Sequence, residues 1–384
     1  MAVEATPRRR DLRLDFFRGL ALWFIFLNHM HYNALSWLTN RNYGFSDATE
    51  IFVFISGYSA AIAYGGAMER QGFLIASARI LRRVWQIYVA HMMLFIAFTA
   101  EIAFLATRFD NQMFADEMNV LTFLDEPHVT LIQAILLKFR PLNMDVLPLY
   151  IVLLFVFPLV LWGAMRARAA VLGLSVALYV AARHFGWNLP NYPGDAGWYF
   201  NPFTWQLLFV MGALATRDRA VLAWFARQEH WLVPAAVAYL AFGLFVALNW
   251  HVPALQGTVP RWLAALLYPV DKTSLDPLRL VHFLALAYIA SRWVSPDAAF
   301  LQWRVLRPLV ICGQQSLSVF CVGVFLSFTG EFVLLEYDGS LATQVAVGVV
   351  GIVLLTLLAA LMGWYKAAEK SGSPPRRPQM APAE

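Results

Sequence analysis

Three ionisable residues share one face of an apolar segment near the N-terminus. Asp15, Arg18 and His29 lie in the stretch 14–31, whose other residues are mostly hydrophobic. At about 100° per residue, the eleven residues from Arg18 to His29 leave them about 20° apart on a helix and roughly 16 Å apart along its axis. Ionisable groups in a membrane helix are costly and therefore indicate function. A cation and an imidazole so placed could hold a long anionic ligand whose reactive end reaches the histidine.

The same residues also have a structural interpretation. Arg18 could mark the inner end of the helix at the membrane surface and pair with Asp15 three residues earlier. His31 lies near the outer end of the segment and could simply face water.

A second group of candidates begins the next apolar segment, 49–66. Asp47 precedes this segment and suits the N-cap of a helix. Glu50 shares a face with Gly57, and a glycine there permits a close helix contact that would turn Glu50 toward the bundle. Because a carboxylate can orient a general base, Glu50 or Asp47 is the predicted partner of His29.

A cluster of arginines precedes the third apolar segment. Arg79, Arg82 and Arg83 occupy positions i, i+3 and i+4 of a helix. Guanidinium groups in this pattern could clamp phosphates on the cytoplasmic side. The excess of positive charge that marks cytoplasmic connections explains them equally well.

A further polar group lies at the start of an apolar segment near residue 203. Asn201, Trp205 and Gln206 combine an indole with amides, which can bind the face and the hydroxyls of a sugar, and His282 is a further candidate. Each of these polar residues alone is more often part of an interhelical hydrogen bond.

The composition predicts an all-α, polytopic integral membrane protein. Of the 384 residues, 60% are hydrophobic and 14% are charged, whereas soluble domains average about 25% charged residues. We expect about ten transmembrane helices, roughly at 14–31, 49–66, 84–106, 146–164, 168–183, 203–216, 231–249, 280–293, 308–329 and 341–363.

The distribution of charge predicts the topology. Most lysines and arginines fall in alternate connections, which places both termini in the cytoplasm. We expect a cytoplasmic N-terminal segment 1–13, one transmembrane domain 14–363, and a cytoplasmic, Pro-rich, disordered tail 364–384. The basic residues lie between apolar segments, so the net charge of +5 does not indicate a nucleic-acid partner.

Several classes of chemistry lack their motifs. The chain contains no G-x-x-x-x-G-K-[ST], H-E-x-x-H or C-x-x-C pattern, which argues against ATP hydrolysis and a metal site. Cys312 and Cys321 would lie on opposite faces of one helix and could not form a disulfide with each other. No internal repeat is evident, which argues mildly against an inverted-repeat transporter.

The candidate residues also resemble those of a known family. Asp15-x-x-Arg18-Gly19, with ten residues between Arg18 and His29, resembles the first-helix signature of the membrane-bound acyltransferase-3 superfamily. Glu50–Tyr58 resembles its second-helix motif, with Glu where Asp is usual. Blocks between about residues 8 and 330 resemble the OpgC family more closely: 13–20, 44–47, 54–58, 201–209 and 313–321.

The resemblance implies a bacterial inner-membrane enzyme that adds succinyl groups to osmoregulated periplasmic glucans. It implies acyl-CoA as co-substrate, no bound cofactor, and the lipid bilayer and a glucan as partners, with a homo-oligomer left open. The implied roles are a base at His29 assisted by Glu50 or Asp47, and an acyl-CoA site at Asp15, Arg18, Arg79, Arg82 and Arg83. The acceptor would meet Asn201, Trp205, Gln206 and His282.

Two questions stay open at this point. The residues alone also allow a transporter or exporter that uses the intramembrane Arg, His and Glu as an anion site or proton relay. A dicarboxylic acyl group would need one further cation, for which the sequence offers Arg41, Arg183, Arg261 and Arg279 without a choice among them.

Overall fold

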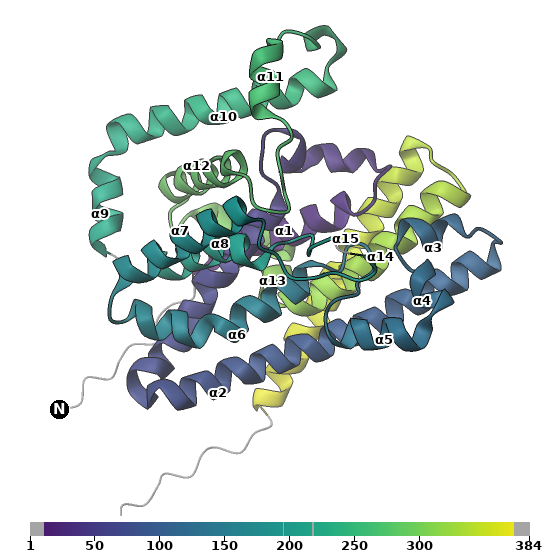
Figure 1. Ribbon diagram of the computed structural model, residues 1–384, viewed down its shortest axis with the longest axis horizontal. Helices are drawn as coiled ribbons and strands as arrows, with labels where there is room; N and C mark the ends of the chain where they lie inside the picture. The colour runs from purple at the N-terminus through teal and green to yellow at the C-terminus, as the bar shows by residue number, and fades with distance from the viewer. Residues whose placement is uncertain (1–10, 195, 217–218, 372–384) are drawn as a thin grey trace, which may run out of the picture.

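The computed structural model describes residues 11–194, 196–216 and 219–371, and within them the regular elements are all helical, as predicted. The α-helices α1 to α5 precede residue 145 in the chain, and α6 to α15 follow it (Figure 1). The α-helices are α1 (Leu12–Asn28), α2 (Ala48–Arg108), α3 (Met113–Glu117), α4 (Leu121–Asp125), α5 (Pro127–Ile135), α6 (Val146–Ala164), α7 (Arg168–Phe185), α8 (Pro202–Ala215), α9 (Arg219–Arg227), α10 (Glu229–His251), α11 (Arg261–Leu267), α12 (Pro277–Trp293), α13 (Arg307–Gln314), α14 (Ser316–Glu336) and α15 (Leu341–Ser371).

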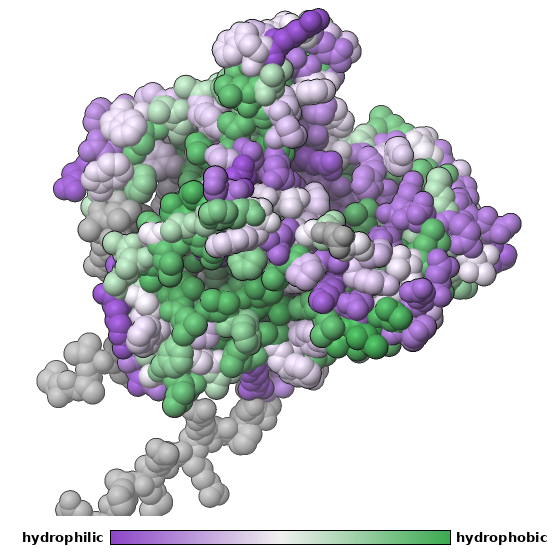
Figure 2. Space-filling view, in the orientation of Figure 1, coloured by the Kyte–Doolittle hydropathy of each residue, from purple (hydrophilic) through white to green (hydrophobic). Residues whose placement is uncertain are grey.

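Five of these helices are long and apolar enough to cross a membrane, namely α2, α6, α10, α14 and α15. Figure 2 shows a broad hydrophobic area over α6 and its neighbours, which suits contact with lipid. The chain is therefore a membrane protein. All ten predicted apolar segments are helical, but several helices are short, such as the 14 residues of α8. The count of about ten spans and the cytoplasmic termini stay predictions.

The helix α2 joins two of the predicted segments. Its 61 residues include a break at Gly72, whose φ of +80° lies in the region that favours glycine. The two halves of α2 run in different directions from this point (Figure 1). The stretch 67–83, expected as a connection, is therefore helical on both sides of the break, and the predicted arginine cluster lies on the second half.

Glycines bring the helices that carry the site into close contact. A Cβ added at Gly19 of α1 would overlap the backbone oxygen of Leu309 in α13, and one at Gly57 of α2 would overlap that of Phe209 in α8. Small residues at such crossings let helix backbones approach. The predicted close contact at Gly57 is confirmed, and Glu50 on the same face is fully buried.

The long connections carry short helices. Helices α3, α4 and α5 lie between α2 and α6, and the 3-10 helix Pro253–Leu255 and α11 lie between α10 and α12. Both cysteines are free. The last helix continues to Ser371, so the first residues of the expected tail are helical, and the rest of that tail lies outside the described residues.

Candidate active site

A cavity of about 910 Å³ opens where the end of α1 meets the start of α2. Such a volume is typical of a site for a small ligand. The loops before α6, α8 and α12 complete the wall. Its polar lining consists of Asn28, His29, His31, Arg41, Ser46, Asp47, Thr49, Asn119, Arg140, Asn143, Asp145, Asn188, Asn191, Tyr199, Lys272, Thr273 and Arg279.

His29 lies in the wall of this cavity, half-buried, directly after the last residue of α1. Its backbone N–H donates to the Ile25 oxygen at 3.0 Å. This last hydrogen bond of the helix fixes the backbone position from which the imidazole extends. The Nδ1 atom is buried and has no hydrogen-bond partner within the described ranges. Buried polar atoms normally have partners. The imidazole of His29 thus has hydrogen-bonding capacity that the described residues do not use.

Two acids and two cations form a buried ion cluster beside His29, made of Asp47, Glu50, Lys272 and Arg279. Asp47 Oδ2 lies 2.6 Å from Lys272 Nζ and 3.0 Å from an Arg279 nitrogen. Glu50 Oε1 lies 2.6 Å from the same guanidinium. Burial raises the pKa of the Asp47 carboxyl, but Lys272 and Arg279 outweigh burial and hold that pKa well below its ordinary value. Asp47 is therefore a carboxylate.

Local helix capping explains why both acids face this cluster. Asp47 caps α2 by accepting from the Thr49 N–H at 2.8 Å, and Glu50 Oε2 accepts from the Asp47 N–H at 2.9 Å. This reciprocal arrangement is a capping box. The remaining carboxylate oxygens then meet the cations that α12 and the loop before it supply.

The cluster corrects the predicted role of these acids. In the described part of the chain, no hydrogen bond joins either Asp47 or Glu50 to His29, and both carboxylates bind cations instead. The sequence offered one signal for this outcome, since two buried acids at a helix start require compensating cations. It did not identify Lys272, and it listed Arg279 only among four arginines.

Those four arginines separate clearly in the structure. Arg41 is exposed and lines the cavity, and Arg279 lines it within the ion cluster. Arg183 lies 3.5 Å from the Asp276 carboxylate, and Arg261 is exposed at the start of α11, outside the lining.

The four residues predicted to meet an acceptor do not line the cavity. Asn201 caps α8 by accepting from the Phe203 N–H at 3.0 Å. Gln206 bonds the Ser175 side chain of α7 at 2.6 Å. Capping and interhelical hydrogen bonding, the alternative given above for such residues, account for both side chains.

The other two of these residues fix segments that do line the cavity. The Trp205 indole N–H donates to the backbone oxygens of Lys272 at 3.2 Å and Thr273 at 3.1 Å. His282 Nδ1 lies 2.7 Å from the Ser46 hydroxyl. Trp205 and His282 therefore position the wall from behind it.

A further polar group lines the same cavity. Arg140 donates to Asp145 at 3.0 Å and to the Asn191 amide oxygen at 2.8 Å. Asn188 and Tyr199 lie in the same lining. These residues follow no apolar periodicity in the sequence, which is why the pattern of segments did not reveal them.

The inner half of the α1 stripe is tied to the bundle. Arg18 lies 3.9 Å from the Asp15 carboxylate and donates to the Ser59 hydroxyl of α2 and, at 3.5 Å, to the Gly313 oxygen of α13. The predicted stripe thus faces the interior, and the structural alternative of an Asp15–Arg18 pair is also present.

The arginines of α2 lie on its second half. Arg79 and Arg82 are exposed, and Arg83 is half-buried and donates to Gln86 at 3.2 Å. Their predicted contact with acyl-CoA is neither supported nor opposed by this arrangement, because exposed guanidinium groups are free to bind an anion or to face lipid headgroups.

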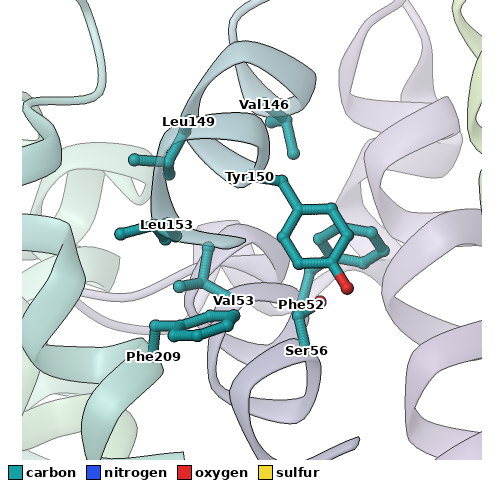
Figure 3. Close-up of a pocket in the computed structure, with 8 residues that line it drawn as sticks. All are labelled: Phe52, Val53, Ser56, Val146, Leu149, Tyr150, Leu153 and Phe209. Carbon is teal, nitrogen blue, oxygen red and sulfur yellow. The ribbon is translucent and has the colours of Figure 1, made fainter. Parts of the chain in front are cut away.

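A second cavity is too small to be a substrate site. Side chains of α2, α6 and α8 enclose a volume of about 10 Å³, and Figure 3 shows their apolar groups together with the hydroxyls of Ser56 and Tyr150. This space is about that of one water molecule. Within the described residues, no group of three or more His, Cys, Asp or Glu side chains is arranged to hold a metal ion.

Comparison with known families gives one match. A family model described as OpgC protein matches residues 10–367, nearly the whole chain. No curated protein and no solved structure matches the chain.

Proposed function

Because the chain belongs to the OpgC family, we propose that it is a membrane O-acyltransferase that moves a succinyl group from cytoplasmic acyl-CoA to the hydroxyls of a periplasmic glucan. The observation that carries this proposal is the cavity in which His29 ends the helix that also holds Arg18. The proposal places the protein in the bacterial inner membrane, with both termini in the cytoplasm and the cavity toward the periplasm.

The donor would bind along α1. The phosphates of CoA would meet Arg18, which Asp15 holds, and the exposed Arg79 and Arg82 of α2. About 16 Å of helix separate Arg18 from His29. An extended pantetheine arm can cover that distance and bring the thioester to the imidazole.

The acceptor would bind in the outer part of the cavity. The amides of Asn188 and Asn191 can hydrogen-bond sugar hydroxyls, and the ring of Tyr199 can pack on a sugar face. These three residues take the place of the acceptor residues predicted from the sequence. The cavity volume of about 910 Å³ leaves room for a glycosyl unit and the end of the acyl chain.

The transfer step needs a base at the meeting point of donor and acceptor. In our proposal His29 removes the proton of a glucan hydroxyl as its oxygen attacks the thioester carbonyl carbon. A C–O bond forms, the C–S bond breaks, and the sulfur leaves with the bonding electron pair. Lys272 and Arg279 stay bound to Asp47 and Glu50, so the ion cluster fixes the wall and does not take the proton.

Mass spectrometry of periplasmic glucans tests this function. A deletion strain would be complemented with the wild-type protein or with His29→Ala at equal abundance in the membrane. We expect the wild type to restore an anionic substituent of the mass of a succinyl group and His29→Ala to restore none. Glucans unchanged by the wild type would refute the acceptor and bring transport forward, whereas restoration by both would refute the base.

A further inference from the structure

A second imidazole lines the same cavity and is held by a buried acid. His31 Nδ1 lies 2.7 Å from Glu331 Oε1 of α14, and the same oxygen accepts from the His31 backbone N–H at 3.3 Å. The Glu331 side chain is 2% exposed, whereas that of His31 is 48% exposed. The carboxylate is therefore sequestered behind a ring that reaches the cavity.

The fold is shaped to make this contact. A Cβ added at Gly330 would lie 2.7 Å from the sulfur of Met30, so the glycine beside Glu331 lets α14 approach the turn after α1 without displacing that side chain. The second oxygen of Glu331 is buried and has no hydrogen-bond partner among the residues described. The buried Glu331 carboxylate thus bonds to His31.

The bond to Glu331 determines which ring nitrogen can act. With Nδ1 engaged by the carboxylate, Nε2 is the nitrogen available to the cavity, and the imidazolium form is stabilised. His31 follows α1 and is outside it, and its hydrogen bond to Glu331 raises its pKa above the ordinary value. Burial and Arg41 oppose this shift, and the nearby Glu117 of α3 adds to it.

The two histidines of the cavity therefore have opposite surroundings. His31 has a buried carboxylate bonded to it, which favours its protonated form. His29, directly after α1, has no carboxylate bonded to it in the described structure. Burial and then Lys272 lower its pKa below the ordinary value, and Asp47 opposes this shift. Two titratable groups whose environments favour different protonation states are suited to act as an acid and a base.

We propose that His31, held by Glu331, is the general acid of the transfer step. As the C–S bond breaks, the Nε2 proton of His31 passes to the sulfur and gives the free thiol of CoA. His29 meanwhile accepts the hydroxyl proton, and one proton transfer from His29 to His31 restores both groups. This assignment rests on the proposed acyltransferase function. It adds to that function the group that protonates the leaving sulfur.

The test measures the pH dependence of acyl transfer by the purified full-length protein. Release of CoA thiol and formation of glucan ester would be followed with succinyl-CoA and purified glucan for the wild type, His31→Gln and Glu331→Gln. The matched control is Glu336→Gln, because Glu336 is an exposed residue of the same helix that accepts from Asn111 at 2.8 Å. Thermal unfolding of each variant would show that it is folded.

We expect His31→Gln to lower the rate by about 10²-fold, the lower end of general acid–base contributions. Glu331→Gln removes the charge that stabilises the imidazolium, so the alkaline limb of its pH profile should move to lower pH. Glu336→Gln should match the wild type in both respects.

Two results would overturn the assignment while leaving the enzyme in place. One is a wild-type rate and profile in both His31→Gln and Glu331→Gln, and the other is a lower rate in Glu331→Gln with an unmoved alkaline limb. The second result would show that the pair only connects α14 to α1. A wild-type protein that forms no ester under any of these conditions would instead refute the acyltransferase function, and the acid role with it.

Discussion

Two groups of ionisable side chains lie at one cavity and differ in how many of their polar atoms have bonding partners. In the ion cluster, Asp47 and Glu50 each bind a cation at 3.0 Å or less. At the histidine end, the described residues offer no partner to the Nδ1 atom of His29 and bond only one ring nitrogen of His31.

The difference separates what builds the site from what can react in it. Charges that neutralise one another in a buried cluster fix α2 against α12, but they offer a ligand little that is not already used. An imidazole with a free nitrogen in a cavity can still exchange a proton. In our proposal the carboxylates near His29 therefore belong to the scaffold, and the carboxylate that supports the chemistry is that of Glu331, far away in the sequence, which holds His31.

The largest effect is expected from removing the proposed base. His29→Gln should lower acyl transfer by about 10² to 10⁴-fold, because a positioned general base contributes that much. Its thermal unfolding should stay unchanged, since the His29 side chain makes no hydrogen bond to another of the described residues. His128→Gln, at an exposed position of α5, is the control and should keep the wild-type rate. Comparable rates for both variants would remove His29 from the mechanism.

Breaking the ion cluster should reduce stability. Glu50→Ala leaves Arg279 with one buried carboxylate and should cost about 3–5 kcal/mol in the free energy of unfolding, the usual penalty for removing one partner of a buried pair. Denaturation in detergent would measure it. As the control, Glu229→Ala breaks an exposed pair with Arg292 and should change nothing measurable. Equal, small losses would show that the cluster is not a structural centre.

A smaller effect should follow from filling the crossing of α2 and α8. Gly57→Ala places a methyl group against the Phe209 backbone oxygen and should cost about 1–3 kcal/mol in unfolding free energy. Gly173→Ala on α7 is the same substitution with no atom within 4 Å. It should be neutral or stabilise by a fraction of a kcal/mol. A tolerated Gly57→Ala would mean that the helices can separate there without loss.

The smallest effect concerns a residue behind the cavity wall. Trp205→Phe removes the donor to the backbone oxygens of Lys272 and Thr273 and should cost about 1 kcal/mol in unfolding free energy. Because Trp205 only positions this segment, the transfer rate should fall by less than 10-fold, with KM for the glucan unchanged. A specific rise in that KM would restore Trp205 to the acceptor site.

The spacing of residues along the chain predicted the helices well. It predicted the bonding partners of the site residues poorly. The apolar periods and the α1 stripe follow from neighbouring residues, and so does the capping position of Asp47. The cation that binds Glu50 is 229 residues away, and the acid that binds His31 is 300 residues away. Such contacts depend on which helices meet, and no local spacing encodes that.

Two misreadings have the same origin. The basic stretch around Arg79 lies between two predicted apolar segments and is therefore predicted to be a connection, whereas the chain stays helical there and breaks only at Gly72. Asn201 and Gln206 were expected to meet a sugar because of their amides, whereas those amides complete a helix cap and a bond to α7. In both cases the sequence indicated the chemistry of a side chain, but it did not indicate which residues surround that side chain in the folded protein.

The most direct test follows a labelled acyl group across a membrane. Purified protein in vesicles with glucan trapped inside would receive succinyl-CoA labelled in the acyl chain on the outside. We expect label in ester linkage to the trapped glucan with the wild type and none with His29→Gln. Label that accumulates inside as free acid or intact thioester, with no ester formed, would contradict this expectation and identify a transporter.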